Sequence, residues 1–289
     1  MNPGKPAKPL VAVTGAYGYI GGILSRRFEA AGWSVRALVR SPRAGDSLAR
    51  PYELGRPPAD GLLDSVDVLV HCAYDLSLVR REDVWRTNVE GTRELLRTAA
   101  QTGVPRIIVL SSMSAYTGTT QLYGQAKLAV EEATKAIGGC PVRPGLVYGD
   151  DPGGMAGALR KITKLPLVPV IAGNSRQFPV HEDDLAAAVL ALATVDNPPQ
   201  VPLGVAQSES VSFRSLLRAL AVEDNPRFVP VPWQLPYGLL RLGELLGVKL
   251  PLRSDSLKGL IYPAPEVPGQ ELLAALGVVP RPLKVPDNR

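Results

Sequence analysis

Residues 14–21 of this 289-residue chain, Thr14-Gly15-Ala16-Tyr17-Gly18-Tyr19-Ile20-Gly21, decide its fold. An apolar run at 10–13 precedes them, and residues 20–31 follow with apolar side chains at helical spacing. A strand, a tight turn and a helix N-terminus in this order bring free backbone N–H groups and a positive dipole end to one place, where a pyrophosphate binds. The stretch therefore predicts a dinucleotide-binding turn.

The three glycines of this turn have different expected roles. Gly15 permits the turn, Gly18 lets a cofactor approach the backbone, and Gly21 lets the helix pack closely on the sheet. Each role requires the absence of a Cβ atom. A glycine-rich hairpin is the alternative, but the flanking strand and helix oppose it. The residues between the glycines complete the predicted cofactor contacts in the turn: Tyr17, Tyr19 and Ile20.

Composition narrows the class of protein. With 45% apolar and 20% charged residues the chain is typical of a globular domain, and no apolar run approaches the roughly 18 residues of a membrane span. The net charge of +5 is spread along the chain, which does not favour nucleic acid as a partner. Cys72 and Cys140 indicate neither a disulfide nor a metal set. We therefore expect a cytoplasmic protein that binds no membrane.

Apolar, β-branched runs alternate with helical patterns through the first half of the chain. The expected strands are 10–13, 35–39, 66–70, 106–110 and 141–143, and the expected helices are 20–31, 82–100 and 123–137. This alternation predicts an α/β fold with a doubly wound parallel sheet, the Rossmann fold, whose ligand cleft lies at the carboxyl ends of the strands.

We divide the chain into three parts. Residues 1–9 form a polar, proline-rich tail, residues 10–148 form the dinucleotide-binding Rossmann domain with 175–200 packing back on it, and residues 149–289 form mostly a smaller substrate-binding lobe. Helices are expected at 183–193, 212–221 and 235–246. The stretch 233–246 is apolar enough to indicate a partner or membrane surface, but we favour a helix covered within the lobe.

A tyrosine and a lysine open the helix expected at 123–137. Tyr123 and Lys127 stand four residues apart and therefore share one helix face. The ammonium group stabilises a phenolate, so we expect the pKa of Tyr123 to fall from about 10 toward neutrality, where the phenol exchanges a proton with a substrate oxygen. Ser111, Ser112 and Ser114 follow the strand at 106–110, where a hydroxyl faces the cleft or caps a turn.

The sequence resembles the short-chain dehydrogenase/reductase superfamily, and within it the extended branch of epimerases and related reductases. The resemblance lies in the order of three motifs: the glycine turn, the serines after the strand at 106–110, and Tyr-x-x-x-Lys. Four further stretches are similar to blocks of that branch: Val70-His71-Cys72-Ala73, Asn88-Val89-Glu90-Gly91-Thr92, Arg143-Pro144-Gly145-Leu146-Val147-Tyr148-Gly149 and Phe178-Pro179-Val180-His181-Glu182-Asp183-Asp184-Leu185. The resemblance covers about residues 10–195.

This resemblance implies a role for each residue of the site. Tyr123 is the acid/base, Lys127 orients the cofactor ribose and tunes Tyr123, and Ser112 holds the substrate carbonyl, with Ser111 and Ser114 as fallbacks. The nicotinamide supplies or accepts the hydride. Four residues outside the glycine turn are also expected at the cofactor: Cys72, Ala73, Asn88 and Arg143. Of these, Asn88 is expected to be structural rather than catalytic.

The end of the strand at 35–39 bears on the choice of cofactor. No acid stands there to accept the ribose hydroxyls of NAD. Arg40 occupies the position next to the ribose and Arg43 follows, and a guanidinium group pairs well with a 2′-phosphate. The stretch favours NADP(H) over NAD(H), whereas the alternative is an NAD enzyme with two solvated arginines.

Two departures from the extended branch limit the reaction. Only eleven positions separate Ser112 from Tyr123, a shorter loop than in many relatives, so a sugar-nucleotide specificity does not transfer safely. Met113 and Ser114 stand where sugar dehydratases carry an Asp-Glu pair, so dehydration is disfavoured. His181 and the acids after it begin and cap a helix and hold no metal.

We therefore expect an NADPH-dependent ketoreductase acting on a small-molecule carbonyl or sugar. An epimerase of sugars or sugar nucleotides is the first alternative, with the same residues and a tightly retained NAD. A non-catalytic dinucleotide-binding or assembly protein is the second alternative, opposed by the complete Ser112, Tyr123 and Lys127 set. Relatives often pair through the helices at 82–100 and 123–137, so the resemblance allows a homodimer.

Overall fold

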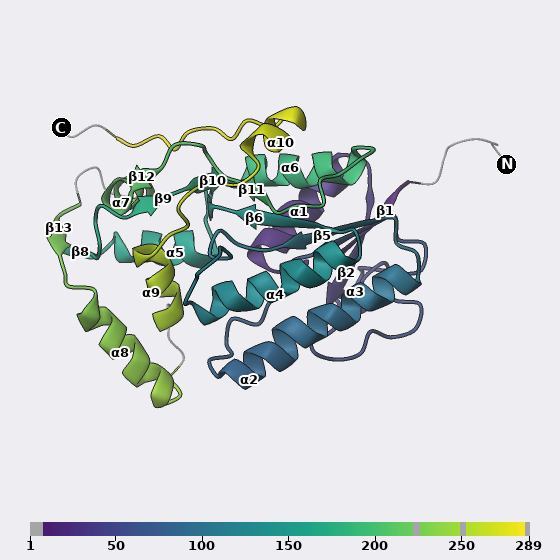
Figure 1. Cartoon of the computed structure of the whole chain (residues 1–289), viewed down its shortest axis with the longest axis horizontal. Coiled ribbons are helices and arrows are strands. Elements are labelled where there is room, and N and C mark those ends of the chain that lie inside the picture. Colours follow the sequence, from purple (N-terminus) through teal and green to yellow (C-terminus); the bar gives the residue numbers. More distant parts are fainter. Residues whose placement is uncertain (1–7, 222–225, 249–252, 287–289) are drawn as a thin grey trace. The chain divides into compact units, whose positions relative to one another are not determined.

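A computed structural model describes residues 8–221, 226–248 and 253–286 (Figure 1). Most of the expected tail, residues 1–7, lies outside this range. Seven strands form a parallel sheet in the order β11-β6-β5-β4-β1-β2-β3, with flanking helices. In chain order they are β1 Leu10–Thr14, β2 Ser34–Val39, β3 Arg50–Pro51, β4 Val68–His71, β5 Arg106–Leu110, β6 Cys140–Pro144 and β11 Leu203–Val205. This confirms the predicted Rossmann-like sheet.

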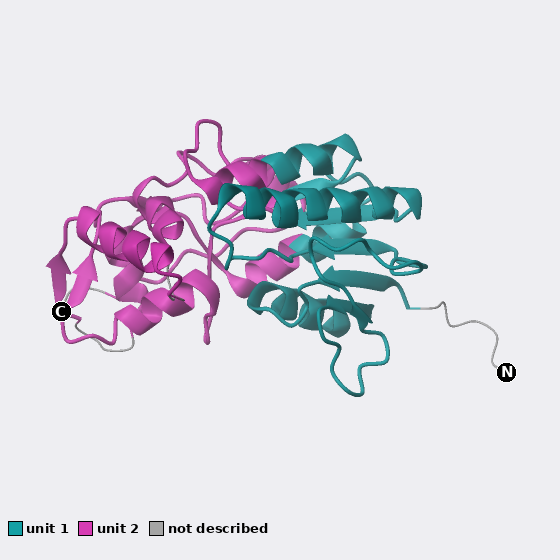
Figure 2. Cartoon of the chain, turned by 90° about the horizontal axis from the view of Figure 1, so that it is seen from below, with its two compact units in different colours: residues 1–110, 129–141, 189–201 teal, residues 111–128, 142–188, 202–289 magenta. Residues whose placement is uncertain are grey.

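The chain divides into two compact units, coloured separately in Figure 2. Unit 1 comprises residues 1–110, 129–141 and 189–201, and unit 2 comprises residues 111–128, 142–188 and 202–289. The glycine turn belongs to unit 1, whereas Ser112, Tyr123 and Lys127 belong to unit 2.

In unit 1 the apolar runs of the sequence are the inner strands of the sheet. β1 pairs in parallel with β2 and β4, so that Val13 lies opposite Ala37 on one side and Val70 on the other. Strands buried on both faces are apolar throughout rather than alternating. The helices of this unit are α1 Tyr19–Ala30, α2 Arg81–Val84, the π-helix η1 Trp85–Glu90, α3 Gly91–Gln101, and parts of α4 Leu122–Ala136 and α6 Glu182–Thr194.

Unit 2 carries short strands and most of the later helices. Its remaining strands form the pairs β7 Leu146–Tyr148 with β10 Pro179–His181, β9 Arg176–Gln177 with β12 Val211–Ser212, and β8 Val168–Val170 with β13 Phe228–Pro230. Its helices besides α4 and α6 are α5 Gly154–Ile162, α7 Phe213–Leu220, α8 Gln234–Leu245, α9 Ser254–Ile261 and α10 Gln270–Ala275. The helices expected at 183–193, 212–221 and 235–246 are confirmed, and α5, α9 and α10 were not predicted.

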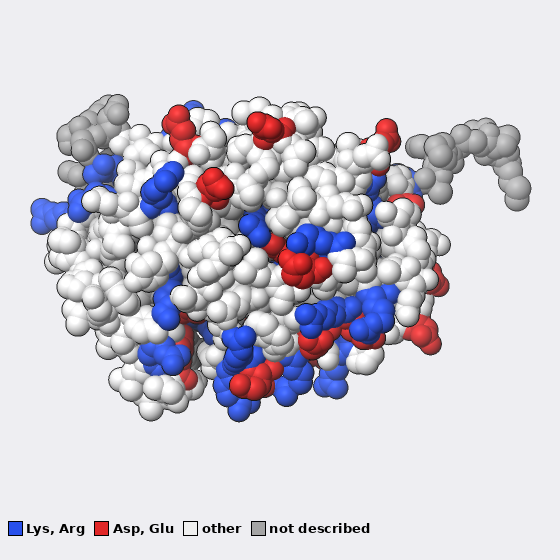
Figure 3. Space-filling model, in the orientation of Figure 1, with Lys and Arg blue, Asp and Glu red and all other residues white. Residues whose placement is uncertain are grey.

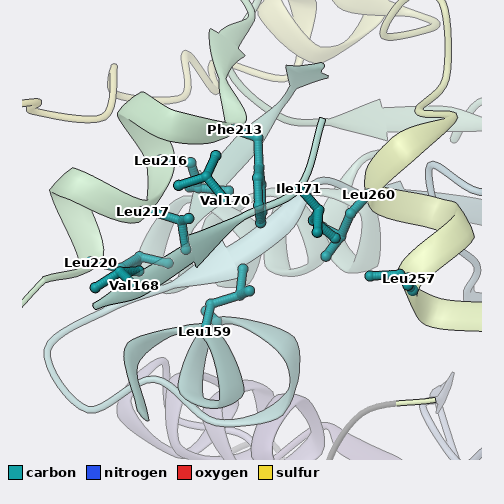
Figure 4. Packing of buried hydrophobic residues seen from close by; sticks show 11 residues of the cluster. Leu159, Val168, Val170, Ile171, Phe213, Leu216, Leu217, Leu220, Leu257 and Leu260 are labelled. Atoms are coloured by element: carbon teal, nitrogen blue, oxygen red, sulfur yellow. The ribbon is translucent and has the colours of Figure 1, made fainter. Parts of the chain in front are cut away.

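A buried apolar cluster holds these short elements together (Figure 4). Leu216 and Leu217 of α7 meet Val168 and Val170 of β8, and Leu257 of α9 belongs to the same cluster. Each fully buried leucine contributes about 1.5–3 kcal/mol of stability. The cluster therefore fixes the position of α9, whose polar residues bear on the candidate site.

The expectation that 233–246 forms a covered helix is wrong. α8 has no buried residue, and Leu235, Leu239 and Leu245 are each more than half exposed. The physical reason is that only one of its two apolar faces packs on the cluster, through residues such as Tyr237 and Leu240. Within the part of the chain that the structure describes, no helix has both the length and the apolar character needed to cross a membrane.

Candidate active site

The glycine turn after β1 has the geometry expected of a phosphate-binding turn. Gly15 adopts a φ of +66°, and its carbonyl accepts the Gly18 N–H at 2.8 Å. A Cβ on Gly18 would lie 3.1 Å from that carbonyl oxygen, so a side chain would crowd the turn. No side chain caps the N-terminus of α1, and its first turn carries no acidic residue. A cofactor pyrophosphate therefore fits this turn.

We expected Gly21 to be a glycine because the helix packs closely on the sheet, but the structure shows a different reason. A Cβ there would lie 2.3 Å from the carbonyl oxygen of Gly15 and 3.0 Å from Cα of Ala16. Helix α1 therefore packs directly against the turn, and the absence of a Cβ at Gly21 preserves the conformation of the turn. Gly22, one position on, has its nearest neighbours at 3.5 Å, an ordinary contact.

A chain of buried hydrogen bonds connects Thr14, the first residue of the turn, to the neighbouring elements. Thr14 Oγ1 lies 2.8 Å from His71 Nδ1, and His71 Nε2 lies 2.9 Å from Thr92 Oγ1. Thr92 donates its one hydroxyl hydrogen to the Asn88 carbonyl at 2.6 Å. Its oxygen must then accept from His71 Nε2–H, which leaves Nδ1 as the acceptor of the Thr14 hydroxyl. The chain joins β1, β4 and α3 and fixes the histidine tautomer.

The residues after β4 lie at the glycine turn, as their predicted role requires. The N–H groups of Cys72 and Ala73 donate to Thr14 Oγ1 at 2.9 and 3.0 Å. Ala73 lies close to the turn, because a Cβ on Gly15 would be 3.3 Å from its Cα. Asn88 is fully buried and accepts the Asp75 N–H at 2.7 Å, a contact that a structural role would use.

Of the two arginines after β2, Arg43 is held at the glycine turn. Its guanidinium lies 4.0 Å from the ring centroid of Tyr17, and its backbone N–H donates to the Tyr17 hydroxyl at 3.1 Å. That hydroxyl donates in turn to Asp46 Oδ2 at 3.1 Å. Arg40 and Arg43 are both exposed, and the contacts with Tyr17 are made by Arg43. Sequence reasoning missed Asp46, because it lies seven residues beyond the end of β2.

Ser112 and Tyr123 are brought together in unit 2. Ser112 follows β5 by two residues, and its side chain is hydrogen-bonded to Tyr123 near the start of α4. Lys127 is buried, with its Nζ 5.8 Å from the ring centroid of Tyr123. The hydrogen bond favours Ser112 over its neighbours Ser111 and Ser114 as the partner of Tyr123. Arg143 lies in β6 of the same unit.

The expected lowering of the pKa of Tyr123 is not found. Burial raises the pKa of this phenol to about 12, and the Ser112 hydrogen bond acts against that rise. Burial removes water that would solvate a phenolate, and this loss exceeds the gain from the neighbouring hydroxyl. Tyr123 is therefore a protonated phenol at neutral pH.

Asp255, which sequence reasoning missed, holds the start of the helix that carries Tyr123. Its Oδ1 accepts the Leu122 N–H at 3.1 Å, and its Oδ2 accepts the Tyr123 N–H at 2.8 Å. α4 has no acidic residue in its own first turn, so this carboxylate from α9 caps the helix from outside. Glu244 of α8 caps α9 in the same way, accepting the Ser254 N–H at 2.8 Å.

Replacing Asp255 with alanine is expected to lower the free energy of unfolding by about 1–2 kcal/mol, because two helix N–H groups lose their acceptor. We also expect turnover to fall several-fold, since Tyr123 is the second residue of the helix that loosens. Thermal unfolding and steady-state kinetics measure the two effects. Glu271→Ala, at an exposed acid in the first turn of α10, is the control. A loss of the same size in both variants would remove Asp255 from this role.

The block around His181 begins and caps a helix, as expected. His181 Nδ1 accepts the Asp183 N–H at 3.2 Å at the start of α6. The guanidinium of Arg281 contacts both carboxylate oxygens of Asp184, the shortest contact being 2.7 Å. In the described ranges no group of three His, Cys, Asp or Glu side chains is arranged to hold a metal ion.

A model of the NAD dependent epimerase/dehydratase family matches residues 11–204, more than half of the chain, so the chain belongs to that family. This confirms the predicted place in the extended branch of the short-chain dehydrogenase/reductase superfamily, whose members bind NAD(P). The chain is 28% identical to a ceramide reductase of Caulobacter vibrioides over 83% of this chain and 78% of the relative. It is 29% identical to the dTDP-6-deoxy-L-talose 4-dehydrogenase (NAD(P)(+)) of Kitasatospora kifunensis, over 78% of this chain and 82% of that one.

Solved structures agree on the fold. MoeE5 in complex with UDP-glucose and NAD matches with a TM-score of 0.71 at 21% identity, over 94% of this chain and 93% of that one. The terminal R domain from the myxalamid PKS-NRPS biosynthetic pathway matches with a TM-score of 0.73 at 16% identity, over 97% and 88%. At these identities the likeness shows the fold alone.

Proposed function

We propose that this protein reduces a ketone to an alcohol with NADPH. The observation that carries the proposal is the hydrogen bond between Ser112 and Tyr123, on the helix that also carries Lys127. When bound, the nicotinamide supplies the hydride to the carbonyl carbon. Ser112 donates a hydrogen bond to the carbonyl oxygen, and Tyr123 transfers its hydroxyl proton to that oxygen as negative charge develops there.

The protonation state of Tyr123 favours reduction as the first step. Reduction consumes a proton, and a phenol with a pKa of about 12 holds that proton at neutral pH. The ammonium of Lys127 then stabilises the phenolate that remains. An epimerase would begin by oxidising a carbinol, which requires Tyr123 to start as the base. The raised pKa therefore supports the reductase over the epimerase.

For the substrate we propose a lipid-borne ketone. The similarity to a ceramide reductase extends over 83% of this chain, well beyond the glycine turn and into the lobe. A keto sugar is the alternative, supported by the similarity to a dTDP-6-deoxy-L-talose 4-dehydrogenase. We expect the short loop between Ser112 and Tyr123 to leave room for a large substrate.

The test of the proposal begins with protein stripped of cofactor, after the released material has been analysed. We expect exchangeable NADPH, bound more tightly than NADH, and oxidation of NADPH with long-chain ketones. Retained NAD together with interconversion of sugar epimers, without net consumption of cofactor, would overturn the reductase and establish an epimerase. Binding of neither nucleotide would leave an assembly protein.

Arg43 is expected to provide the preference for NADPH, because Tyr17 holds its guanidinium at the glycine turn. Arg43→Ala should weaken NADPH by roughly ten- to a hundredfold, the effect of one lost charge-assisted contact, with NADH nearly unchanged. Arg40→Ala should act in the same direction and more weakly, since the Tyr17 ring holds Arg43 and not Arg40. Arg56→Ala, at an exposed arginine paired with Glu53, is the control. Equal losses for both nucleotides would show that Arg43 does not recognise the 2′-phosphate.

A further inference from the structure

Tyr17 of the glycine turn contacts the exposed segment that follows β2. Its ring centroid lies 4.0 Å from Cζ of Arg43, and its hydroxyl oxygen accepts the Arg43 backbone N–H at 3.1 Å. The same hydroxyl donates to Asp46 Oδ2 at 3.1 Å. The other carboxylate oxygen of Asp46 accepts the Ala49 N–H at 3.0 Å, and the Asp46 N–H donates to the Arg43 carbonyl at 3.2 Å. Asp46 is therefore joined to Arg43 through Tyr17 as well as through the backbone.

Asp46 determines how Tyr17 holds this segment. An ionised carboxylate only accepts hydrogen bonds, so the single hydroxyl hydrogen of Tyr17 is directed at Asp46, and a lone pair of the hydroxyl oxygen is left to accept the Arg43 N–H. Residues 40–45 are all exposed, whereas Asp46 is half-buried. Because no buried side chain fixes residues 40–45, the position of Arg43 depends on its contacts with Tyr17 and on the carboxylate that orients the hydroxyl.

The positive charge of Arg43 is not paired with an acid. Arg93 pairs with Glu90 three residues away, and Figure 3 shows such arginines beside acids over α2 and α3. Arg43 and Asp46 are also three residues apart, yet among the described residues no ion pair joins Arg43 to a carboxylate. An aromatic face attracts a guanidinium without neutralising it, so the N–H groups of Arg43 remain able to bind an anion.

We propose that Asp46 is a positioning residue for the 2′-phosphate of NADPH: through Tyr17 it holds the guanidinium of Arg43 where this phosphate binds. The inference rests on the proposed function, since NADH lacks the phosphate. It also gives Tyr17 a part in nucleotide preference besides the direct cofactor contact predicted from sequence. The sign of the effect is distinctive. By charge alone an acid near a phosphate weakens NADPH binding, whereas a positioning acid strengthens it.

The experiment is calorimetric titration of the full chain with NADPH and with NADH. Asp46→Ala removes the acceptor of the Tyr17 hydroxyl, so NADPH affinity should fall about three- to tenfold while NADH affinity stays within about twofold. Asp46→Asn removes the charge but can keep both contacts, its carbonyl accepting from Ala49 and its amide donating to the Tyr17 oxygen. This variant should bind NADPH at least as tightly as the natural chain. Glu29→Ala, at an exposed acid near the opposite end of α1 from the glycine turn, is the control.

A double-mutant cycle separates the positioning of Arg43 from a local structural effect. Adding Asp46→Ala to Arg43→Ala should cause no further loss of NADPH affinity, because Asp46 acts through Arg43. Tyr17→Phe, which keeps the ring and removes only the hydroxyl, should behave like Asp46→Ala. Four results would overturn the inference: a further loss in the double variant, equal losses for both nucleotides, natural affinity in Tyr17→Phe, or tighter NADPH binding by both Asp46 variants.

Failure of the proposed function would give a different result. If the natural chain bound NADH as tightly as NADPH, the preference for NADPH would be refuted and the role of Asp46 with it. If the natural chain preferred NADPH and only Arg43→Ala lost that preference, while Asp46→Ala kept it, the role of Asp46 alone would be refuted. Thermal unfolding of each variant confirms that the titrated protein is folded.

Discussion

Replacing Tyr123 with phenylalanine is expected to lower kcat for ketone reduction by about a hundred- to ten-thousandfold, the usual contribution of a positioned general acid. The substitution removes the hydroxyl that Ser112 contacts and leaves the ring beside Lys127 in place. Because the ring remains, the packing around α4 and the affinity for NADPH should change little. Pre-steady-state and steady-state rates, with a titration of NADPH, separate the chemical step from binding.

Tyr116 offers a matched control for this substitution. It lies in the same loop, between Ser112 and Tyr123, and its hydroxyl donates to the Tyr262 carbonyl at 3.2 Å. Tyr116→Phe therefore also removes one tyrosine hydroxyl and one hydrogen bond, and we expect turnover within a few-fold of the natural protein. If Tyr123→Phe retained natural turnover, or if both variants lost it equally, Tyr123 would not be the acid.

The parts of the site that were predicted from sequence are those whose geometry is local. The glycine turn lies between a strand and a helix that adjoin it in the chain, and Tyr123 and Lys127 are one helical turn apart. Asp255 could not be found in this way. It reaches the N–H of Tyr123 from 132 residues away, through a helix placed by the apolar cluster of unit 2. Its acid stands in a Ser-Asp-Ser sequence with no chemical signature of its own.

Two further outcomes depended on burial, which the sequence does not show. The neighbouring lysine made a lowered pKa of Tyr123 the natural expectation, but desolvation acts in the opposite direction and is the larger effect. For α8 we favoured a covered helix over a partner or membrane surface, whereas one of its faces packs and the other is exposed. In both cases the residue types were correct and their environment was decided by distant parts of the chain.

Replacing Gly21 with alanine is expected to abolish tight NADPH binding, with a loss of at least about a hundredfold. The added Cβ would lie 2.3 Å from the Gly15 carbonyl oxygen and 2.8 Å from its carbonyl carbon, so the backbone of the turn must move. Overpacking against backbone costs about 1–3 kcal/mol of stability. The moved turn also redirects the N–H groups at the start of α1, on which the pyrophosphate is expected to bind.

Gly22→Ala separates this effect from a general change in α1. It adds the same methyl group to the next residue of the same helix, where the nearest atoms, of Ala16 and Arg26, lie at 3.5 Å. Alanine favours a helix over glycine by about 0.5–1 kcal/mol, so this variant should unfold at the same or a higher temperature and bind NADPH normally. Thermal unfolding and nucleotide titration of the two variants, side by side, measure the difference. Natural affinity in Gly21→Ala would show that the turn tolerates the methyl group and that the pyrophosphate does not depend on its present shape.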